Sequence, residues 1–232
     1  MGILRSTYLL LFVFFIKVTV FAQVSLAEVD TTKIEYPAVI KYLHRQMDNG
    51  INTFDEIQPS LIPGESINNY NVVVREFLIK DSIDKVWDIY ENSGLQRTWS
   101  TRKIHYGFSY SRPDSSIFYA GDELNKLVPG MIVYLNLDLL YGVKNLAMAF
   151  EVTRVDEENK VIEFSYLKGN ETEGKQQLIF QSNSKGNTLI THLSYYKSRV
   201  KPRDKLYPHV HATIINRFHR NMKRIYKEKS EN

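Results

Sequence analysis

The chain has 232 residues and no cysteine, which excludes disulfides, thiol chemistry, cysteine-ligated metals and lipid attachment through a cysteine. Its composition, 43% hydrophobic and 12% aromatic, is typical of a globular protein and not of a disordered one. The net charge of +4 is unevenly distributed, because residues 197–229 carry 11 lysines and arginines against only Asp204 and Glu228. A basic C-terminal segment on a more acidic body favours an anionic partner.

Residues 1–22 have the organisation of a secretory signal peptide. Arg5 gives a positive start, an apolar run from Tyr8 to Phe21 follows, and the small residue Ala22 precedes a polar segment. We therefore predict cleavage near Ala22 and an exported protein, either periplasmic or secreted. Such a protein meets lipid headgroups more readily than nucleic acid, so no nucleic-acid partner is expected. The alternative is an uncleaved N-terminal anchor, although the run is interrupted by Lys17 and is shorter than the roughly 20 apolar residues of a spanning helix.

Residues 23–70 are predicted to form an N-terminal extension with one short helix, over residues 36–50. Pro37 suits the first turn of this helix, and Gly50 follows its last turn. The apolar residues of the helix share one face, which should pack against another element. Residues 51–70 contain Pro59 and Pro63 and show no sustained period, so they are predicted to be a loop.

Residues 71–229 are predicted to form the main domain. A strand over 71–80 precedes a helix over 82–93, in which Ile83, Val86, Trp87 and Tyr90 follow the helical period. Alternating or continuous apolar residues then predict further strands, and polar turns of about five residues join the last of them into two hairpins. These strands are expected over 104–111, 131–140, 147–155, 161–167, 175–182 and 188–197.

The last predicted helix, over 204–229, has two distinct faces. Its apolar face should cover a sheet and consists of Tyr207, His211, Ile214, Ile215, Phe218, Met222, Ile225 and Tyr226. The opposite face is basic and includes Arg217, Arg220, Arg224 and Lys227. This basic face is either a solvated surface or a contact for an anionic membrane.

This order of elements resembles the helix-grip fold of the START/Bet v 1-like (SRPBCC) superfamily, which includes polyketide cyclases and lipid-transfer domains. The resemblance covers residues 71–229 and is carried by the strand Val72–Ile79, the helix start Ser82–Trp87, Trp99 and Gly121-Asp122-Glu123. The chain differs from the plant allergen branch, because no G-x-G-x-x-G loop follows the second strand. The resemblance implies an α+β fold, in which a curved antiparallel sheet wraps around the long C-terminal helix and leaves a cavity.

His211 is the most informative candidate for the cavity, because a leucine would be expected at its position on the apolar helix face. It is either a polar group that orients a ligand or acts as an acid or base, or a core histidine that bonds a tyrosine or a carbonyl group. On strand 188–197, His192 and Ser194 alternate with Leu193 and Tyr195 and are expected to face solvent. The candidate ligand-binding residues are Trp99, Tyr106, Tyr110, Phe150, Tyr166, Tyr195, His211 and Ile215.

No catalytic or cofactor motif is present: the sequence has no G-x-S-x-G elbow, no P-loop and no H-E-x-x-H helix. His209 and His211 would point about 200° apart on a helix, so no metal site is predicted. No cofactor is predicted either. The leading hypothesis is an exported carrier of a hydrophobic small molecule or lipid. The alternatives are a cyclase- or hydrolase-like enzyme that uses His211, and an interaction protein with a filled core.

Overall fold

The computed structural model describes residues 23–124, 126–139 and 144–231, so the predicted signal peptide lies outside the described residues. Within these residues, the strands form one antiparallel sheet in the order β1-β8-β7-β6-β5-β4-β2-β3. The strands are β1 (Asn71–Ile79), β2 (Ile104–Ser111), β3 (Ser116–Tyr119), β4 (Met131–Leu139), β5 (Lys144–Asp156), β6 (Val161–Tyr166), β7 (Thr172–Ser182) and β8 (Thr188–Ser198).

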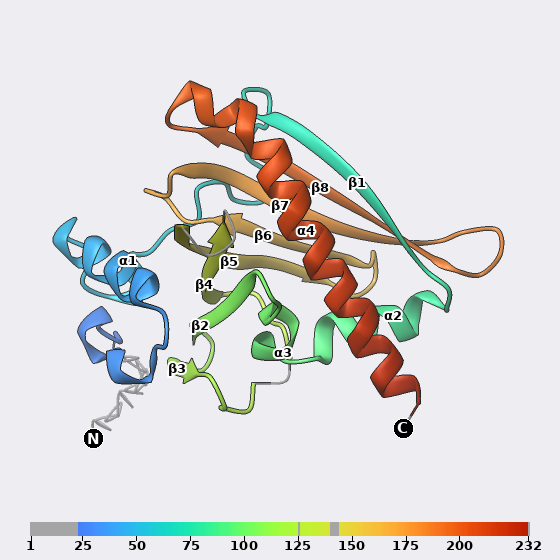
Figure 1. The fold of residues 1–232 in the computed structure, drawn as a ribbon, viewed down its shortest axis with the longest axis horizontal. Helices are drawn as coiled ribbons and strands as arrows, with labels where there is room; N and C mark the ends of the chain where they lie inside the picture. Colours follow the sequence, from blue (N-terminus) through green and yellow to red (C-terminus); the bar gives the residue numbers. More distant parts are fainter. Residues whose placement is uncertain (1–22, 125, 140–143, 232) are drawn as a thin grey trace, which may run out of the picture.

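The helices include one long element and several short ones. The α-helices are α1 (Pro37–Asp48), α2 (Ile83–Asn92), α3 (Leu95–Trp99) and α4 (Lys201–Ser230), and the 3-10 turns are Leu26–Glu28, Thr31–Lys33 and Phe54–Glu56. Figure 1 shows α4 crossing one face of the curved sheet diagonally, with α2 and α3 beside its C-terminal half. This arrangement confirms the predicted α+β helix-grip fold. The strand β3 and the short helix α3 were not predicted.

The inner face of the sheet, which faces α4, carries the larger apolar core. Alternate residues of β4 and β5, such as Leu135 and Phe150, point to this side and are buried. The Trp99 ring of α3 stacks on the Phe218 ring of α4, with 4.4 Å between the ring centroids. Met222 of α4 is also fully buried here. The C-terminal half of α4 is thus packed tightly against the sheet and the two short helices.

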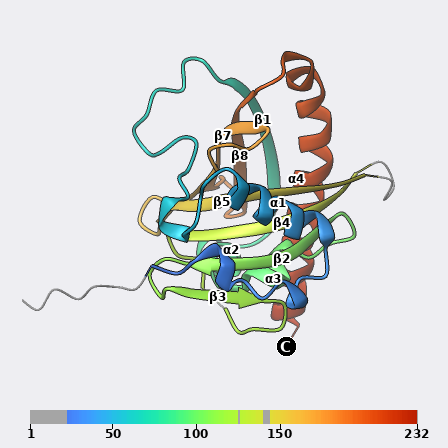
Figure 2. The same cartoon turned by 90° about the vertical axis from the view of Figure 1, so that its left-hand side faces the viewer.

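The outer face of the sheet is covered by the N-terminal extension over β2, β4 and β5. Figure 2 shows α1 lying across these strands. Residues Val39, Leu43 and Phe54 of the extension pack against Phe108 and Tyr134 of the sheet in a second apolar core. Both faces of β4 are therefore buried, which explains why its sequence is almost continuously apolar instead of alternating.

A β-bulge at Gly107 makes this second core possible. The register of β2 against β4 shifts between Tyr106 and Phe108. Tyr106 therefore belongs to the inner core, whereas Phe108 and Tyr110 belong to the outer core. A side chain at Gly107 would lie 3.1 Å from both the Tyr134 carbonyl oxygen and the Cγ1 atom of Val39. Only glycine allows α1 to approach the sheet this closely.

The outer face remains uncovered at the β1 edge of the sheet. Val72 and Val74 of β1 are 51% and 54% exposed, respectively. Accordingly, β8 alternates between buried and half-buried residues, unlike β4. None of the described helices has the combination of length and hydrophobicity that a transmembrane span requires.

We predict that Gly107→Ala lowers the free energy of unfolding by about 1–3 kcal/mol, because the added methyl group overpacks the contact with α1. Urea unfolding monitored by circular dichroism measures this change. In a Val39→Ala background the same substitution should cost less, since one of the two clashing groups is gone. An unchanged midpoint for Gly107→Ala would contradict the tight contact described here.

Candidate functional site

A cavity of about 520 Å³ lies between the inner face of the sheet and the N-terminal half of α4. This volume falls within the roughly 300–1,000 Å³ of typical small-molecule pockets. Its walls are mainly apolar, and the apolar lining includes Trp99, Leu135, Leu137, Leu146, Met148, Phe150, Phe164, Ile214 and Ile215. The cavity lies beside the packed C-terminal half of α4, under the first turns of the helix.

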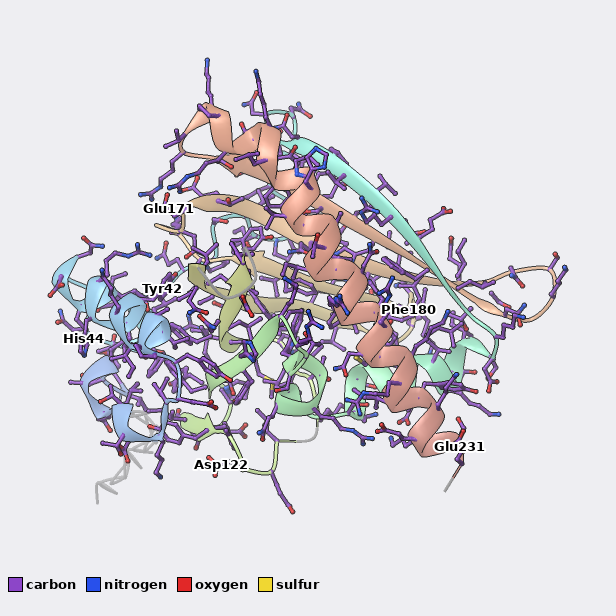
Figure 3. All side chains as sticks on the ribbon, in the orientation of Figure 1. Tyr42, His44, Asp122, Glu171, Phe180 and Glu231 are labelled. Atoms are coloured by element: carbon purple, nitrogen blue, oxygen red, sulfur yellow. The ribbon has the colours of Figure 1, made fainter. Side chains whose placement is uncertain are left out.

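Exposed lining residues mark the side on which the cavity opens. They come from α1 (Lys41 and Arg45) and from the first turns of α4 (Arg203 and Leu206), and Glu171 of the β6–β7 connection lies with them. Figure 3 shows Tyr42 on the side of α1 nearer the sheet, below Glu171. The N-terminal extension therefore contributes part of the cavity mouth.

Pro208 lies inside α4 close to this mouth. Proline has no N–H group, so the carbonyl of Asp204, four residues earlier, loses its helical partner. The Tyr196 hydroxyl of β8 donates to that carbonyl at 3.3 Å. The Asp204 carboxylate also accepts from the Ser198 N–H at 2.8 Å. These two bonds tie the first turns of α4 to the end of β8.

One wall of the cavity is polar and is centred on Gln176 of β7. The Gln176 Oε1 atom lies 2.6 Å from Nε2 of His192 and 3.1 Å from Nε2 of His211. Its Nε2 atom donates to the Tyr166 hydroxyl at 2.6 Å. The Tyr166 hydroxyl lies 2.8 Å from that of Tyr207 on α4. A single amide thus connects β6, β8 and α4.

The hydrogen-bonded chain continues behind the cavity toward α2. His192 Nδ1 lies 2.9 Å from Nε2 of His219, and His219 Nδ1 lies 2.8 Å from the Tyr90 hydroxyl. The Phe77 ring stacks on His219 with 3.7 Å between the ring centroids. The three histidines of this network are therefore buried between the sheet and α4.

The acceptor Gln176 Oε1 fixes the tautomer of each histidine in the chain. His192 and His211 must donate through Nε2, because an amide oxygen only accepts. Neutral His192 then accepts at Nδ1 from the Nε2–H of His219, which in turn accepts from the Tyr90 hydroxyl. The remaining nitrogen of His211, Nδ1, is buried and has no partner among the described residues. This leaves it as an unused hydrogen-bond acceptor.

Burial sets the protonation state of this wall. Burial, and secondarily the positive charge of Arg75, lowers the pKa of His211 to about 3. Burial and the neighbouring histidines hold the pKa values of His192 and His219 well below the ordinary value. Burial raises the pKa of Tyr166 to about 12. Near neutral pH these side chains are uncharged, so the wall offers hydrogen bonds and no charge.

The structure brings five of the eight predicted ligand-binding residues together around the cavity, namely Trp99, Phe150, Tyr166, His211 and Ile215. Their role in binding stays a prediction. Tyr106 is on the inner face, but it is not part of the cavity lining. Its hydroxyl instead donates to the Phe118 carbonyl at 3.0 Å.

The predicted placement of Tyr110 and Tyr195 in the cavity is wrong. Tyr110 lies beyond the Gly107 bulge on the outer face, where its ring stacks on Phe54 with 4.0 Å between the centroids. Tyr195 lies on the outer face of β8, opposite Val72 of β1 and Lys175 of β7.

The expectation that His192 and Ser194 face solvent is also wrong, because both are fully buried beneath α4. Alternation along β8 separates two faces but does not say which face is covered. The polar inward residues of β8 have polar partners on α4: Ser194 Oγ lies 2.7 Å from the Tyr207 hydroxyl. The occurrence of such polar residues on β7, β8 and α4 was the signal that could have identified Gln176, His192 and Ser194.

The basic face of α4 is exposed along most of its length, as predicted, although Arg217 is half-buried. Arg224 forms an ion pair with Glu228 at 2.6 Å. The role of Arg217, Arg220, Arg224 and Lys227 at an anionic membrane stays a prediction. Among the residues that the structure describes, no group of histidine, aspartate and glutamate side chains could hold a metal ion.

Comparison with protein-family models found no match, and comparison with curated proteins found none either. Solved structures with the same fold include the major latex-like protein 151 of Panax ginseng, with 14% identity and a TM-score of 0.50, which covers 68% of this chain and 97% of its own. A norcoclaurine synthase point mutant of Thalictrum flavum with a transition-state analogue has 12% identity and a TM-score of 0.51, with coverages of 69% and 96%. The Thalictrum enzyme with dopamine and hydroxybenzaldehyde has 13% identity and a TM-score of 0.50, with coverages of 74% and 97%.

The curved antiparallel sheet closed by one long C-terminal helix defines this chain as a helix-grip protein. It has the fold of the START/Bet v 1-like superfamily, as the similar solved structures show. About a quarter to a third of the chain lies outside the aligned part, since these structures cover 68–74% of it.

We predict that Gln176→Leu lowers the free energy of unfolding by about 2–5 kcal/mol, although it places an apolar residue in a buried position. Two buried imidazole N–H groups, on His192 and His211, would lose their acceptor, and each such loss costs about 1–3 kcal/mol. Urea unfolding measures the change. Gln181→Leu, on an exposed position of the same strand, is the control and should stay within about 0.5 kcal/mol of the wild type. Equal effects of the two substitutions would contradict the central role of Gln176.

The protein should lose stability as the pH falls from about 6.5 to 5. The unfolded chain protonates its histidines near the ordinary pKa of 6.5, whereas the folded state resists protonation of His192, His211 and His219. The unfolded state thus binds more protons in this range, and each histidine costs about 1.4 kcal/mol per pH unit. Urea unfolding at pH 7 and pH 5 tests the slope. NMR signals showing three charged imidazoles in the folded protein at pH 5 would refute it.

Proposed function

We propose that the protein is a carrier of a hydrophobic small molecule or lipid, held between the sheet and α4. The observation that carries this proposal is the cavity of about 520 Å³ with mainly apolar walls. Burying apolar surface in such a space contributes about 25 cal/mol per Å². The same cavity argues against an interaction protein with a filled core.

The polar wall suits a carrier better than an enzyme. A general acid or base works best when its pKa lies near the operating pH. The pKa of His211, at about 3, and that of Tyr166, at about 12, lie far from neutrality on opposite sides. These groups keep fixed protonation states and can orient a ligand through hydrogen bonds. A cyclase- or hydrolase-like enzyme on the same fold is therefore the second candidate.

We further propose that the carrier acts outside the cytoplasm. The signal-peptide pattern of residues 1–22 supports export. A carrier in this location would meet lipids and their headgroups. Contact with an anionic membrane through the basic face of α4 belongs to the same proposal.

Native mass spectrometry of the protein purified from the exported fraction tests both proposals at once. We expect the mass of a chain that has lost residues 1–22, together with a co-purifying apolar molecule in near-stoichiometric amount. A full-length mass in this fraction would contradict cleavage near Ala22, and absence of the protein from this fraction would contradict export. A ligand-free mass, with no uptake of the uncharged fluorescent probe N-phenyl-1-naphthylamine, would contradict the carrier function.

Leu146→Trp provides the structural control for the probe measurement. Leu146 lines the cavity, and a larger ring at this position takes up space that a ligand needs. The variant should therefore bind the probe at least about tenfold more weakly, a difference of about 1.4 kcal/mol. Val74→Trp, at an exposed position on the outer face, should leave the affinity unchanged.

A further inference from the structure

We propose that the ligand of this cavity is an amphiphile with an anionic group, and that Lys41 and Arg45 of α1 hold that group at the cavity mouth. This inference rests on the carrier function proposed above and names the chemical class of its ligand. The two cations belong to the N-terminal extension, which packs on the outer face of the sheet and still reaches the cavity.

The two basic residues are presented by a helix whose position is fixed. They lie one turn apart on α1, and both line the cavity together with Tyr42. The Tyr42 hydroxyl donates to Oδ1 of Asn170, and Asn170 Nδ2 donates to the Ala149 carbonyl at 2.8 Å. These bonds connect α1 to β5 and to the β6–β7 connection directly at the mouth. The cations are thus held at the entrance by a rigid element.

The charge balance of the mouth leaves these two cations available. Arg203, the third basic residue of the lining, pairs with Glu171, which is the acidic residue of the same lining. Among the described residues, neither Lys41 nor Arg45 forms an ion pair with a carboxylate. The Arg45 guanidinium lies 5.0 Å from the centroid of the Tyr42 ring, which orients it without neutralising it. The mouth therefore carries a net positive charge.

The cavity behind these cations is apolar. Next to α1, the lining consists of Leu137, Leu139, Leu146 and Met148. The uncharged polar wall lies toward α4. A small inorganic anion would leave the apolar walls uncovered, whereas a hydrocarbon would leave the two cations unused. An apolar body that ends in a carboxylate, sulfate or phosphate matches both parts. Since the cations are exposed, their attraction is expected to weaken as salt is added.

The experiment compares cis-parinaric acid with the corresponding uncharged alcohol, whose fluorescent chain is the same. At low ionic strength the wild type should bind the acid about tenfold more tightly than the alcohol, a difference of about 1.4 kcal/mol. The double variant Lys41→Ala/Arg45→Ala should lose this preference and keep its affinity for the alcohol. The preference of the wild type should also decrease in 0.5 M sodium chloride, about the range in which exposed charges are largely screened.

The control is Lys80→Ala/Lys185→Ala, which also removes two exposed positive charges. Lys80 follows β1, and Lys185 lies in the β7–β8 turn. Both are at the opposite end of the sheet from α1 (Figure 1). The control should keep the preference for the acid. Equal binding of both probes by the wild type, or an unchanged preference in Lys41→Ala/Arg45→Ala, would overturn the inference and leave the carrier function standing. Binding of neither probe would overturn the carrier function itself.

Discussion

Hydrogen bonds between buried side chains of α4 and of the sheet set the distance between them, and the cavity depends on that distance. His211 of α4 donates to Gln176, and the Tyr207 hydroxyl of α4 bonds the hydroxyls of Tyr166 and Ser194 in the sheet. If α4 moved closer to the sheet or away from it, buried donors would lose their partners at a cost of about 1–3 kcal/mol each. Farther along α4, buried apolar residues such as Met222 belong to the main core. One helix thus combines a packed half with a half that spans an open space.

The N-terminal extension gives the sheet a second apolar core on its other face. The larger core lies under α4, and the smaller one lies between the extension and strands β2, β4 and β5. The Gly107 bulge serves this arrangement twice, because it turns Phe108 to the outer face and gives α1 room to approach. Once the extension is anchored this way, its helix ends beside the cavity and adds charged groups to a mouth that the sheet and α4 would otherwise form alone.

The sequence predicted the main elements well, because local periodicity determines them. The helical period after residue 204 and the alternation of the strands are visible in any short window of the chain. The assignment of faces was less successful. Tyr110 was placed on the wrong side because a bulge exchanges the two faces without changing the local pattern. The prediction of a solvent-facing His192 was wrong because its buried polar partner, His219 of α4, lies 27 residues later in the sequence.

The position of the N-terminal extension could not be predicted for a similar reason. The apolar face of α1 showed that the helix must pack on another element, but several strands could have received it. Its contacts depend on residues such as Tyr134 and Ala149, which lie about a hundred residues later in the chain. The role of Lys41 and Arg45 follows only from that position, so no local pattern could have indicated it.

The cavity also has a consequence for the response of the protein to hydrostatic pressure. Unfolding eliminates internal void volume, so the unfolded chain with its surrounding water occupies less volume than the folded protein. The cavity of about 520 Å³ opens at its mouth, so the part of it that water does not fill counts as void. A bound ligand replaces part of this space with atoms. The loaded protein should thus have a smaller volume change on unfolding than the empty one.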